Sequence, residues 1–290
     1  MLGMDFSRLR SLVESTYGLG LGSGRIFFVG SSTDRWFVEE QVNNKLDGTV
    51  KTTVDSALSA CESGRGDVVV VLPGSHTLTS AATLKASTRL LGVPGMREAT
   101  IVISKLAENG LSVSNNDCLI QGLTFNVNGS KHGITVTGLR NSIKDCAFER
   151  VSGTPHSYLQ VDGQSGSRGV GTRVADCFFG SHATTAFQLA SDTNDQIADV
   201  VIEGCIIKGA TNGVLLPAHN FSEVIVNNNV FTHATNPINN TAGKTGDGSI
   251  ICHNYMGVAT TDACASATFD ATVLWVGNYS VAGLSTADPA

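Results

Sequence analysis

A short motif recurs seven times in the sequence, and this repetition restricts the chain to few folds. Each copy has an apolar residue, any residue, a bend-forming residue, and then usually Cys or Asn, as in "SIKDCAFE". The fourth positions lie 23 to 31 residues apart, at Leu123, Cys146, Cys177, Cys205, Asn229, Asn254 and Asn278. A repeat of this length, with strand-like alternation instead of helical periodicity, is typical of the coils of a parallel β-helix.

A second motif follows four of these copies at a nearly constant distance. The stretches "GITV", "YLQV", "AFQL" and "GVLL" each place two apolar side chains on one face of a short strand. Each coil therefore has at least two strands, and its remaining length fits a third. We expect three parallel sheets around a filled core over residues 65 to 280.

The third and fourth positions of the motif predict different roles. The third position is mostly Gly, Asp or Asn, which tolerate the left-handed backbone of a tight bend. The fourth position then points inward, so Cys146, Cys177 and Cys205 should stack about 4.8 Å apart, followed by a ladder of Asn229, Asn254 and Asn278. Such a ladder satisfies buried amides. The seven cysteines include no CxxC pair, and we expect free thiols made in a reducing compartment.

Charge and hydropathy exclude two classes of partner. Charged residues make up 15% of the chain and the net charge is −6, without a run of basic residues, so we expect no nucleic acid. No stretch approaches the roughly 18 to 20 apolar residues of a membrane span, so we expect no membrane insertion. The N-terminus "MLGMDFSRLRSLVESTYG" has charges where a signal peptide needs an apolar core.

Before the repeat, "TTVDSALSACESG" predicts a helix with a Thr or Asp cap, which we expect to cover the open end of the coils. The stretches "GDVVVVLPGSHTL" and "RLLGVPG" predict the first strands. We therefore assign residues 48–280 to the capping helix and the β-helix, and residues 281–290 to a C-terminal tail.

Residues 1–47 do not fit the repeat. An amphipathic helix with Phe6, Leu9, Leu12 and Val13 precedes the hinge-like "GLGLGSG" and the apolar strand "RIFFVG". We expect an attachment or assembly segment that exposes a set of aromatic residues, namely Phe27, Phe28, Trp36 and Phe37. The alternative is that this region packs along the coils as a further strand.

The stretch "TTVDSALSACESGRGDVVVVLPGSHTL", "TRLLGVPG" and the "IxDCxF" coils resemble the pectate-lyase-like right-handed parallel β-helix superfamily, over roughly residues 50 to 280. The segment "GSGRIFFVGSSTDRWFVEEQVNNKLDG" resembles a group of β-helix virion structural proteins of tailed bacteriophages. The resemblance implies an all-β, single-stranded right-handed β-helix. It also implies assembly in the host cytoplasm, location in the virion, contact with phage capsid or tail proteins, and a side-by-side homotrimer. The superfamily holds lyases, hydrolases, tailspikes and inert structural proteins, so activity does not follow from the fold.

Two sets of residues are candidates for chemistry on the coils. Asp145 and Asp176 lie one coil apart, as a carboxylate pair for glycoside cleavage would, but Gly or Asn at this position in other coils favours a role in the bend. In the superfamily's enzymes, acidic and basic residues cluster on the outer face of one sheet. The corresponding positions here suit hydrogen bonding or stacking with a sugar better than acid–base catalysis, and they are Thr135, Gln160, Gln188 and Leu215, flanked by Tyr158 and Asp162.

The longest coil carries the Gly/Ser-rich stretch "SGTPHSYLQVDGQSGSRGVGTR", with Asp162, Arg168 and Arg173. These three residues are the alternative catalytic set, because the resemblance implies an Arg base and calcium-binding acids in lyases, although an intersubunit contact is equally consistent. Tyr158, Gln160 and Gln188 are the alternative glycan-binding set. The histidines show no HxH or HExxH spacing, and we expect no metal and no cofactor.

The sequence therefore favours a non-enzymatic bacteriophage virion protein, either a capsid decoration or a tail-associated spike. The alternatives are a carbohydrate-active tailspike or polysaccharide lyase, and an adhesin that binds a host-surface glycan.

Overall fold

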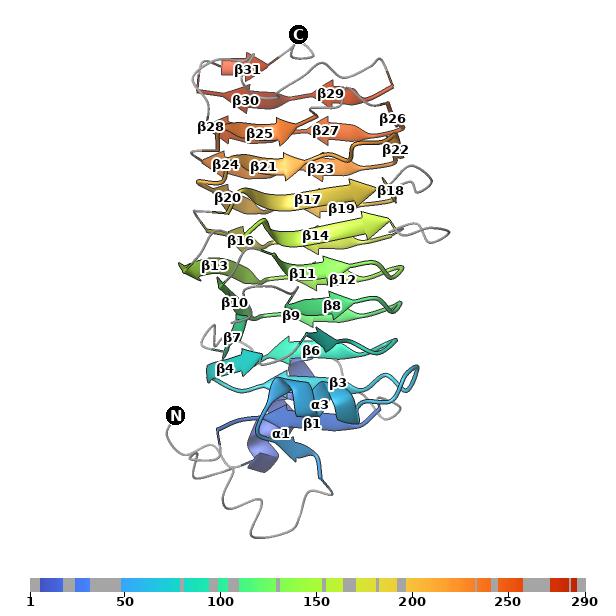
Figure 1. Ribbon diagram of the computed structural model, residues 1–290, viewed down its shortest axis with the longest axis vertical. Helices are drawn as coiled ribbons and strands as arrows, with labels where there is room; N and C mark the ends of the chain where they lie inside the picture. Colours follow the sequence, from blue (N-terminus) through green and yellow to red (C-terminus); the bar gives the residue numbers. More distant parts are fainter. Residues whose placement is uncertain are drawn as a thin grey trace.

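Short parallel strands stack along one axis in the computed structural model, and successive coils of the chain follow one another from the N-terminal to the C-terminal end (Figure 1). The structure describes residues 6–17, 24–31, 48–78, 81–93, 99–103, 110–128, 131–152, 155–163, 171–180, 183–191, 197–232, 234–240, 245–257, 272–281 and 283–285. Within these ranges, no helix is long and apolar enough to cross a membrane.

Three long sheets form the walls of the β-helix. The 11-stranded sheet 1 has the order β2 (Val50–Lys51), β1 (Ile26–Val29), β3 (Val68–Val71), β6 (Arg89–Gly92), β9 (Leu119–Gln121), β12 (Ser142–Lys144), β15 (Arg173–Ala175), β19 (Val201–Glu203), β23 (Ile225–Asn227), β27 (Ile250–Cys252), β29 (Leu274–Val276). The 10-stranded sheet 2 has the order β31 (Gly283–Ser285), β30 (Asn278–Ser280), β28 (Tyr255–Gly257), β24 (Val230–Thr232), β20 (Ile206–Lys208), β16 (Phe178–Phe179), β13 (Ala147–Ser152), β10 (Thr124–Asn128), β7 (Ala99–Ile103), β4 (Gly74–Leu78).

Sheet 3 has seven strands, in the order β25 (Asn236–Asn239), β21 (Asn212–Leu215), β17 (Thr185–Ser191), β14 (Ser157–Gly163), β11 (His132–Val136), β8 (Leu111–Val113), β5 (Ala82–Thr83). The expected three sheets are present, and a short fourth sheet of β18 (Ile197–Ala198), β22 (Phe221–Ser222) and β26 (Gly246–Asp247) was not expected. Strands pair in parallel, except that β31 runs antiparallel to β30. The apolar pairs of sheet 3, such as Ile134 with Val136, are buried as predicted.

The predicted bend column is confirmed. All seven residues at the third motif position have φ between 51° and 70°: Gly122, Asp145, Asp176, Gly204, Asn228, His253 and Gly277. A second left-handed column precedes the strands of sheet 1 from β3 to β27, at Gly66, Ser87, Asp117, Arg140, Gly171, Asp199, Glu223 and Gly248. The sequence pattern did not predict this column, because Arg, Glu and Ser in it are not typical of the left-handed region.

The interior stack at the fourth motif position is also confirmed. Cys146, Cys177 and Cys205 are at most 2% exposed. The six described cysteines are free thiols, and Cys264 lies outside the described residues. Beside this stack, the rings of Phe125, Phe148 and Phe179 lie parallel on consecutive coils, with centroids 5.3 Å and 4.9 Å apart.

The predicted asparagine ladder continues the stack. Asn254 Oδ1 accepts from the backbone N–H and from Nδ2 of Asn229, at 2.9 Å and 3.0 Å. Asn278 Oδ1 accepts in the same way from Asn254, at 3.1 Å and 2.9 Å. Each Nδ2 also donates to a backbone carbonyl, as that of Asn229 does to Ile202 at 3.0 Å. Both polar ends of these buried amides are satisfied, so burial carries no penalty for an unpaired group.

Helix α3 (Val54–Ala60) closes the N-terminal end of the core, as expected. Thr53 caps it by accepting from the backbone N–H of Ser56 at 3.1 Å. The helix contacts β1, β2 and β3 of sheet 1, β4 of sheet 2 and β5 of sheet 3. Its residues Val54, Ala57 and Leu58 are buried in the core cluster.

The expectation that Phe27 and Phe28 are exposed is wrong. Strand β1 pairs with β3 and β2, so it extends sheet 1 beyond the first predicted strand. Phe27 points into the core and Phe28 into an apolar cluster on the outer face, and they are 3% and 2% exposed. The β-helix therefore begins before residue 48, because pairing with β3 buries both rings. Helix α1 (Phe6–Tyr17) forms where an amphipathic helix was predicted.

A second interior position holds an incomplete ladder. Asn141 and Thr172 are adjacent on consecutive coils, since the N–H of Arg173 donates to the carbonyl of Asn141 at 2.9 Å. Asn141 Oδ1 accepts from the N–H of Cys118 at 2.9 Å, as a ladder asparagine does. However, Asn141 Nδ2 and Thr172 Oγ1 are buried without a hydrogen-bond partner.

We expect Thr172→Asn to raise the free energy of unfolding by about 1 kcal/mol, the net value of a buried hydrogen bond. The new Oδ1 would accept from Asn141 as that of Asn254 accepts from Asn229. Denaturant unfolding measures the change. The gain should disappear in an Asn141→Ala background, and an equal gain there would contradict the ladder.

Candidate functional site

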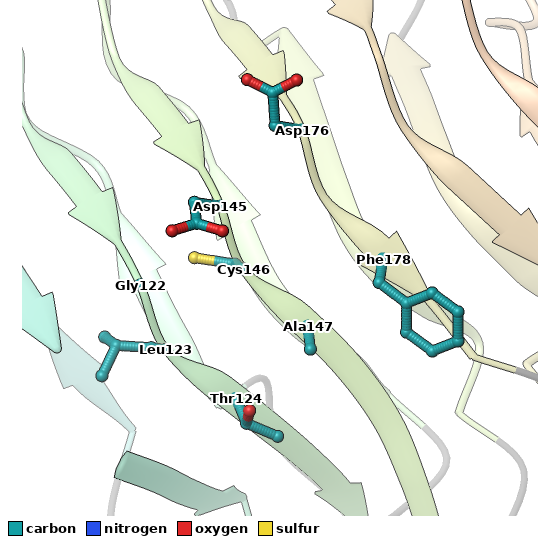
Figure 2. Close-up of a pocket in the computed structure, with 8 residues that line it drawn as sticks. All are labelled: Gly122, Leu123, Thr124, Asp145, Cys146, Ala147, Asp176 and Phe178. Atoms are coloured by element: carbon teal, nitrogen blue, oxygen red, sulfur yellow. The ribbon is translucent and has the colours of Figure 1, made fainter. Parts of the chain in front are cut away.

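A pocket opens to solvent at the corner between sheets 1 and 2. Its lining residues are Gly122, Leu123, Thr124, Asp145, Cys146, Ala147, Asp176 and Phe178, and its empty volume, which includes open solvent, is about 250 Å³ (Figure 2). The pocket forms because Thr124 and Ala147 occupy outward positions that are filled by Phe178 on the next coil. Small side chains therefore leave a recess beside a large ring.

Two carboxylates and one ring give this pocket its chemistry. Asp145 and Asp176 are exposed on neighbouring coils, and the ring of Phe178 is partly exposed (Figure 2). Asp176 Oδ1 lies 2.6 Å from where a Cβ on Gly204 would be, so a side chain at position 204 would require this carboxylate to rotate away. Carboxylates accept hydrogen bonds from hydroxyl groups and a ring face stacks on a sugar, so the pocket is suited to a small polyhydroxylated group.

The N-terminal helix reaches the edge of this pocket. The Tyr17 hydroxyl donates to the carbonyl of Gly92 at 2.8 Å. Burial raises the pKa of Tyr17 to about 12, and the nearby charge of Asp145 adds to this effect. Tyr17 is thus a neutral hydrogen-bond donor next to the Asp145 carboxylate. No sequence pattern indicated this placement, because the helix and the pocket residues are far apart in the chain.

Asp145 and Asp176 serve the bend, as the repeat predicted. Their φ angles are 51° and 54°, like those of Asn228 and Gly204 at the same position of other coils. Asp tolerates this conformation better than most residues. The bend accounts for both residues without a catalytic role.

The outer face of sheet 3 holds the row that the sequence indicated. Thr135, Gln160, Gln188 and Leu215 are in register on consecutive strands. Thr135 Oγ1 and Gln188 Oε1 are buried without a hydrogen-bond partner. This row contains no ionisable group, so it offers no acid or base for catalysis.

The prediction that Tyr158 flanks this row as a sugar-stacking surface is wrong. Tyr158 is 0% exposed, and its ring centroid lies 6.3 Å from that of Phe148 in the core. Tyr158 and Leu159 are consecutive residues of β14, and both belong to the core cluster. Burial does not alternate strictly at this point of the strand, so a pattern of alternation placed Tyr158 on the wrong face.

The alternative catalytic set is distributed over two sheets. Asp162 lies near the end of β14 in sheet 3, whereas Arg173 begins β15 in sheet 1. Arg173 forms an exposed ion pair with Glu203 on the next coil, and its Nε donates to Oε1 at 2.8 Å. Arg168, Trp36 and Phe37 lie outside the described residues.

A polar row at the start of sheet 3 was not predicted. His132, Ser157, Thr185, Asn212 and Asn236 are in register. His132 Nδ1 lies 2.5 Å from Ser157 Oγ, and the ring of His132 meets that of His156 edge-on at 5.2 Å. A serine beside a histidine is the arrangement of an activated nucleophile, but Ser157 is 0% exposed. The row is therefore a structural ladder, and only the coil register reveals it.

Metal ligation finds no support in the described ranges, where no group of three or more His, Cys, Asp or Glu side chains is arranged to hold an ion. The buried thiols are also poor ligands at neutral pH. Sulfur contact with Cys146 raises the pKa of Cys177, and burial raises it further. Burial raises the pKa of Cys118 to about 11. Thiols in this state stay protonated and unreactive.

The pair of histidine rings predicts a pH dependence of stability. Burial lowers the pKa of His132 from 6.5 to about 4, and the nearby His156 and Lys131 add to this. Because the folded pKa is the lower one, the unfolded chain binds the proton more readily between these values. Stability that is present above pH 6.5 should be lost as the pH falls towards 4.

Denaturant unfolding of the wild type and of His132→Asn, from neutral pH down to about 4, measures this loss. Asn keeps a polar group beside Ser157 but does not titrate, so the variant should lose less stability on acidification. Identical pH profiles would show that His132 does not contribute.

Similarity to known proteins is confined to the fold. No family model matches the sequence, and the curated proteins show no significant sequence match. YbhC of Escherichia coli aligns with a TM-score of 0.55 and 10% identity, over 90% of this chain and 86% of that chain. A pectin methylesterase mutant in complex with a hexasaccharide aligns with a TM-score of 0.52 and 10% identity, over 93% of this chain and 92% of that chain. The chain therefore has the pectate-lyase-like right-handed parallel β-helix fold.

Proposed function

We propose that the protein is a non-enzymatic structural component of a bacteriophage virion, mounted on the capsid or the tail. The observation that carries this proposal is an exposed apolar surface, here called the C-terminal corner. The seven large hydrophobic side chains that are exposed among the described residues all belong to it: Ile206, Val230, Tyr255, Leu274, Val276, Tyr279 and Val281. Contiguous apolar surface of this kind marks a protein interface.

The outer faces of the coils support a structural role as well. The polar row of sheet 3 has amides and hydroxyls where acid–base chemistry needs ionisable groups. Arg173 is engaged by Glu203. The virion context rests on the resemblance of residues 22 to 48 to phage structural proteins, and a homotrimer is part of the same proposal.

Only part of residues 1–47 is proposed to attach the protein to the particle. Phe27 and Phe28 stabilise the β-helix itself, which leaves Trp36 and Phe37 as the attachment residues. They lie in the segment between β1 and β2, which are the strands at the N-terminal end of sheet 1. A partner that binds this segment would hold the β-helix by its N-terminal end.

We expect Trp36→Ala with Phe37→Ala to leave a folded protein that no longer joins particles. Mass spectrometry of purified virions measures incorporation, and circular dichroism checks the fold. Lys208→Ala is the control, since Lys208 is exposed on sheet 2, and it should incorporate normally. Normal incorporation of the double variant would move the attachment site to the coils.

The pocket beside Phe178 favours a second function, binding or cleavage of a host-surface glycan. Its two carboxylates are exposed on adjacent coils, whose backbones are about 4.8 Å apart. The exposed bend carboxylates and the ring would then contact one sugar unit.

Under the structural proposal, incubation with capsular and outer-membrane glycans should yield no new reducing ends and no unsaturated products. Turnover that is lost in Asp145→Asn or Asp176→Asn would instead establish the pocket as an active site. Asp199→Asn is the matched control, because Asp199 is an exposed bend residue of the other column. Turnover that is lost only in Asp162→Asn would place the site at the long coil.

A further inference from the structure

We propose that the C-terminal corner of one chain packs against the same corner of a second copy, with the two β-helices parallel. This inference rests on the proposed function, because N-terminal attachment of all copies to one particle requires parallel axes. It adds to that function the surface through which the copies meet.

The corner is an ordered surface and not a scatter of apolar residues. Ile206, Val230, Tyr255 and Tyr279 are in register on β20, β24, β28 and β30. They are 46%, 36%, 43% and 51% exposed. At about 4.8 Å per coil, they form a straight apolar column along sheet 2. A straight column suits another rod with the same coil spacing.

The last coil widens this column around the corner onto sheet 1. Leu274 and Val276 of β29 are 55% and 44% exposed, and Val281 after β30 is 66% exposed. Both strands lie at the C-terminal end of the β-helix (Figure 1). The surface is therefore L-shaped, with its longer arm on sheet 2 and its shorter arm across the end.

The row of large exposed apolar side chains begins at the coil of Ile206. Farther towards the N-terminus, the outward column of sheet 2 continues with Phe178, which is only partly exposed, and then with the small residues Ala147 and Thr124. On sheet 1, the exposed Arg173–Glu203 ion pair joins the coil of Phe178 to the coil of Ile206. The bend residues of both columns are polar or glycine throughout. Among the described residues, large exposed apolar side chains are thus confined to one end, which the coil repeat itself does not require.

The N-terminal end shows what the fold does with a comparable surface. Phe28, Val68, Val70, Leu72, Leu91 and Val93 form an apolar cluster on the outer face of sheet 1, and each is at most 2% exposed. Tyr17 of α1 packs against this cluster. The chain covers its own outer apolar face at one end and exposes a similar one at the other.

A second copy is the occupant that fits this surface. Monomeric proteins rarely expose apolar patches larger than a few hundred Å², and a standard interface buries about 800 Å² per partner. Seven large, roughly half-exposed side chains supply a substantial part of that area. None of the seven is charged, so two identical corners meet without like charges. Equal coil spacing in both copies keeps the columns aligned along their whole length.

Light scattering of the purified full-length chain tests the association. We expect an oligomer for the wild type, and Tyr255→Ser with Tyr279→Ser should weaken its association at least about tenfold. Both side chains point outward, so circular dichroism and the melting of the monomer should stay unchanged. Glu149→Ser, on β13 of the same sheet and two coils away from Ile206, should associate as the wild type does.

A photo-crosslinking residue at position 206 tests the direction. A parallel pair should link position 206 to the β20 region of the other copy, whereas a tail-to-tail pair should link it to Tyr279. A monomeric wild type, an oligomer that the Tyr variants do not affect, or the link to Tyr279 would each overturn this inference. None of these results depends on particles, so incorporation of the Trp36 and Phe37 variants remains a separate test of the proposed function.

Discussion

Every coil of this protein depends on hydrogen bonds from its backbone to the backbone of the coil before it. The bonds continue through the bends: the N–H of Phe178 donates to the carbonyl of Cys146 at 2.8 Å, and that of Ile206 to Cys177 at 2.9 Å. This continuity requires each bend to have the same shape on every coil. The left-handed residues on both sides of sheet 1 give the bends that shape, and the residues that follow them, such as Cys146 and Asn141, point inward.

The sequence predicted the parts of the fold that this repetition controls. Bend residues, the cysteine stack and the asparagine ladder recur with the coil, so a single pattern located them. The second bend column was not predicted, because position 140 holds Arg and position 223 holds Glu, which are not typical of a left-handed backbone. Their backbones are held left-handed by pairing with neighbouring coils, which local preference does not reveal. The burial of Phe27 and Phe28 was expected only under the alternative that this region packs along the coils, because β1 lies outside the repeat and pairs with a strand about 40 residues away.

The candidate site was harder to predict, because the residue types at outward positions do not follow the repeat. Asp145 was located by its bend, but the pocket beside it depends on the size difference between Ala147 and Phe178 across two coils. The contact of His132 with Ser157 likewise joins residues 25 apart that only the register brings together. The spacing of the histidines along the chain did not indicate this contact. Knowledge of the register would have sufficed to find the contact.

The asparagine ladder also bears on how such a protein changes length. Each ladder residue offers Oδ1 to the N–H of the coil before it and presents its own N–H to the coil after it, so all coils between Cys205 and Asn278 have identical junctions. Duplicating or deleting one whole coil in this region would reproduce the same junction. Inserting or deleting only part of a coil would break the hydrogen bonds of this junction. Evolution and engineering can therefore lengthen or shorten this rod in unit steps, while the capping helix at one end and the apolar corner at the other stay intact.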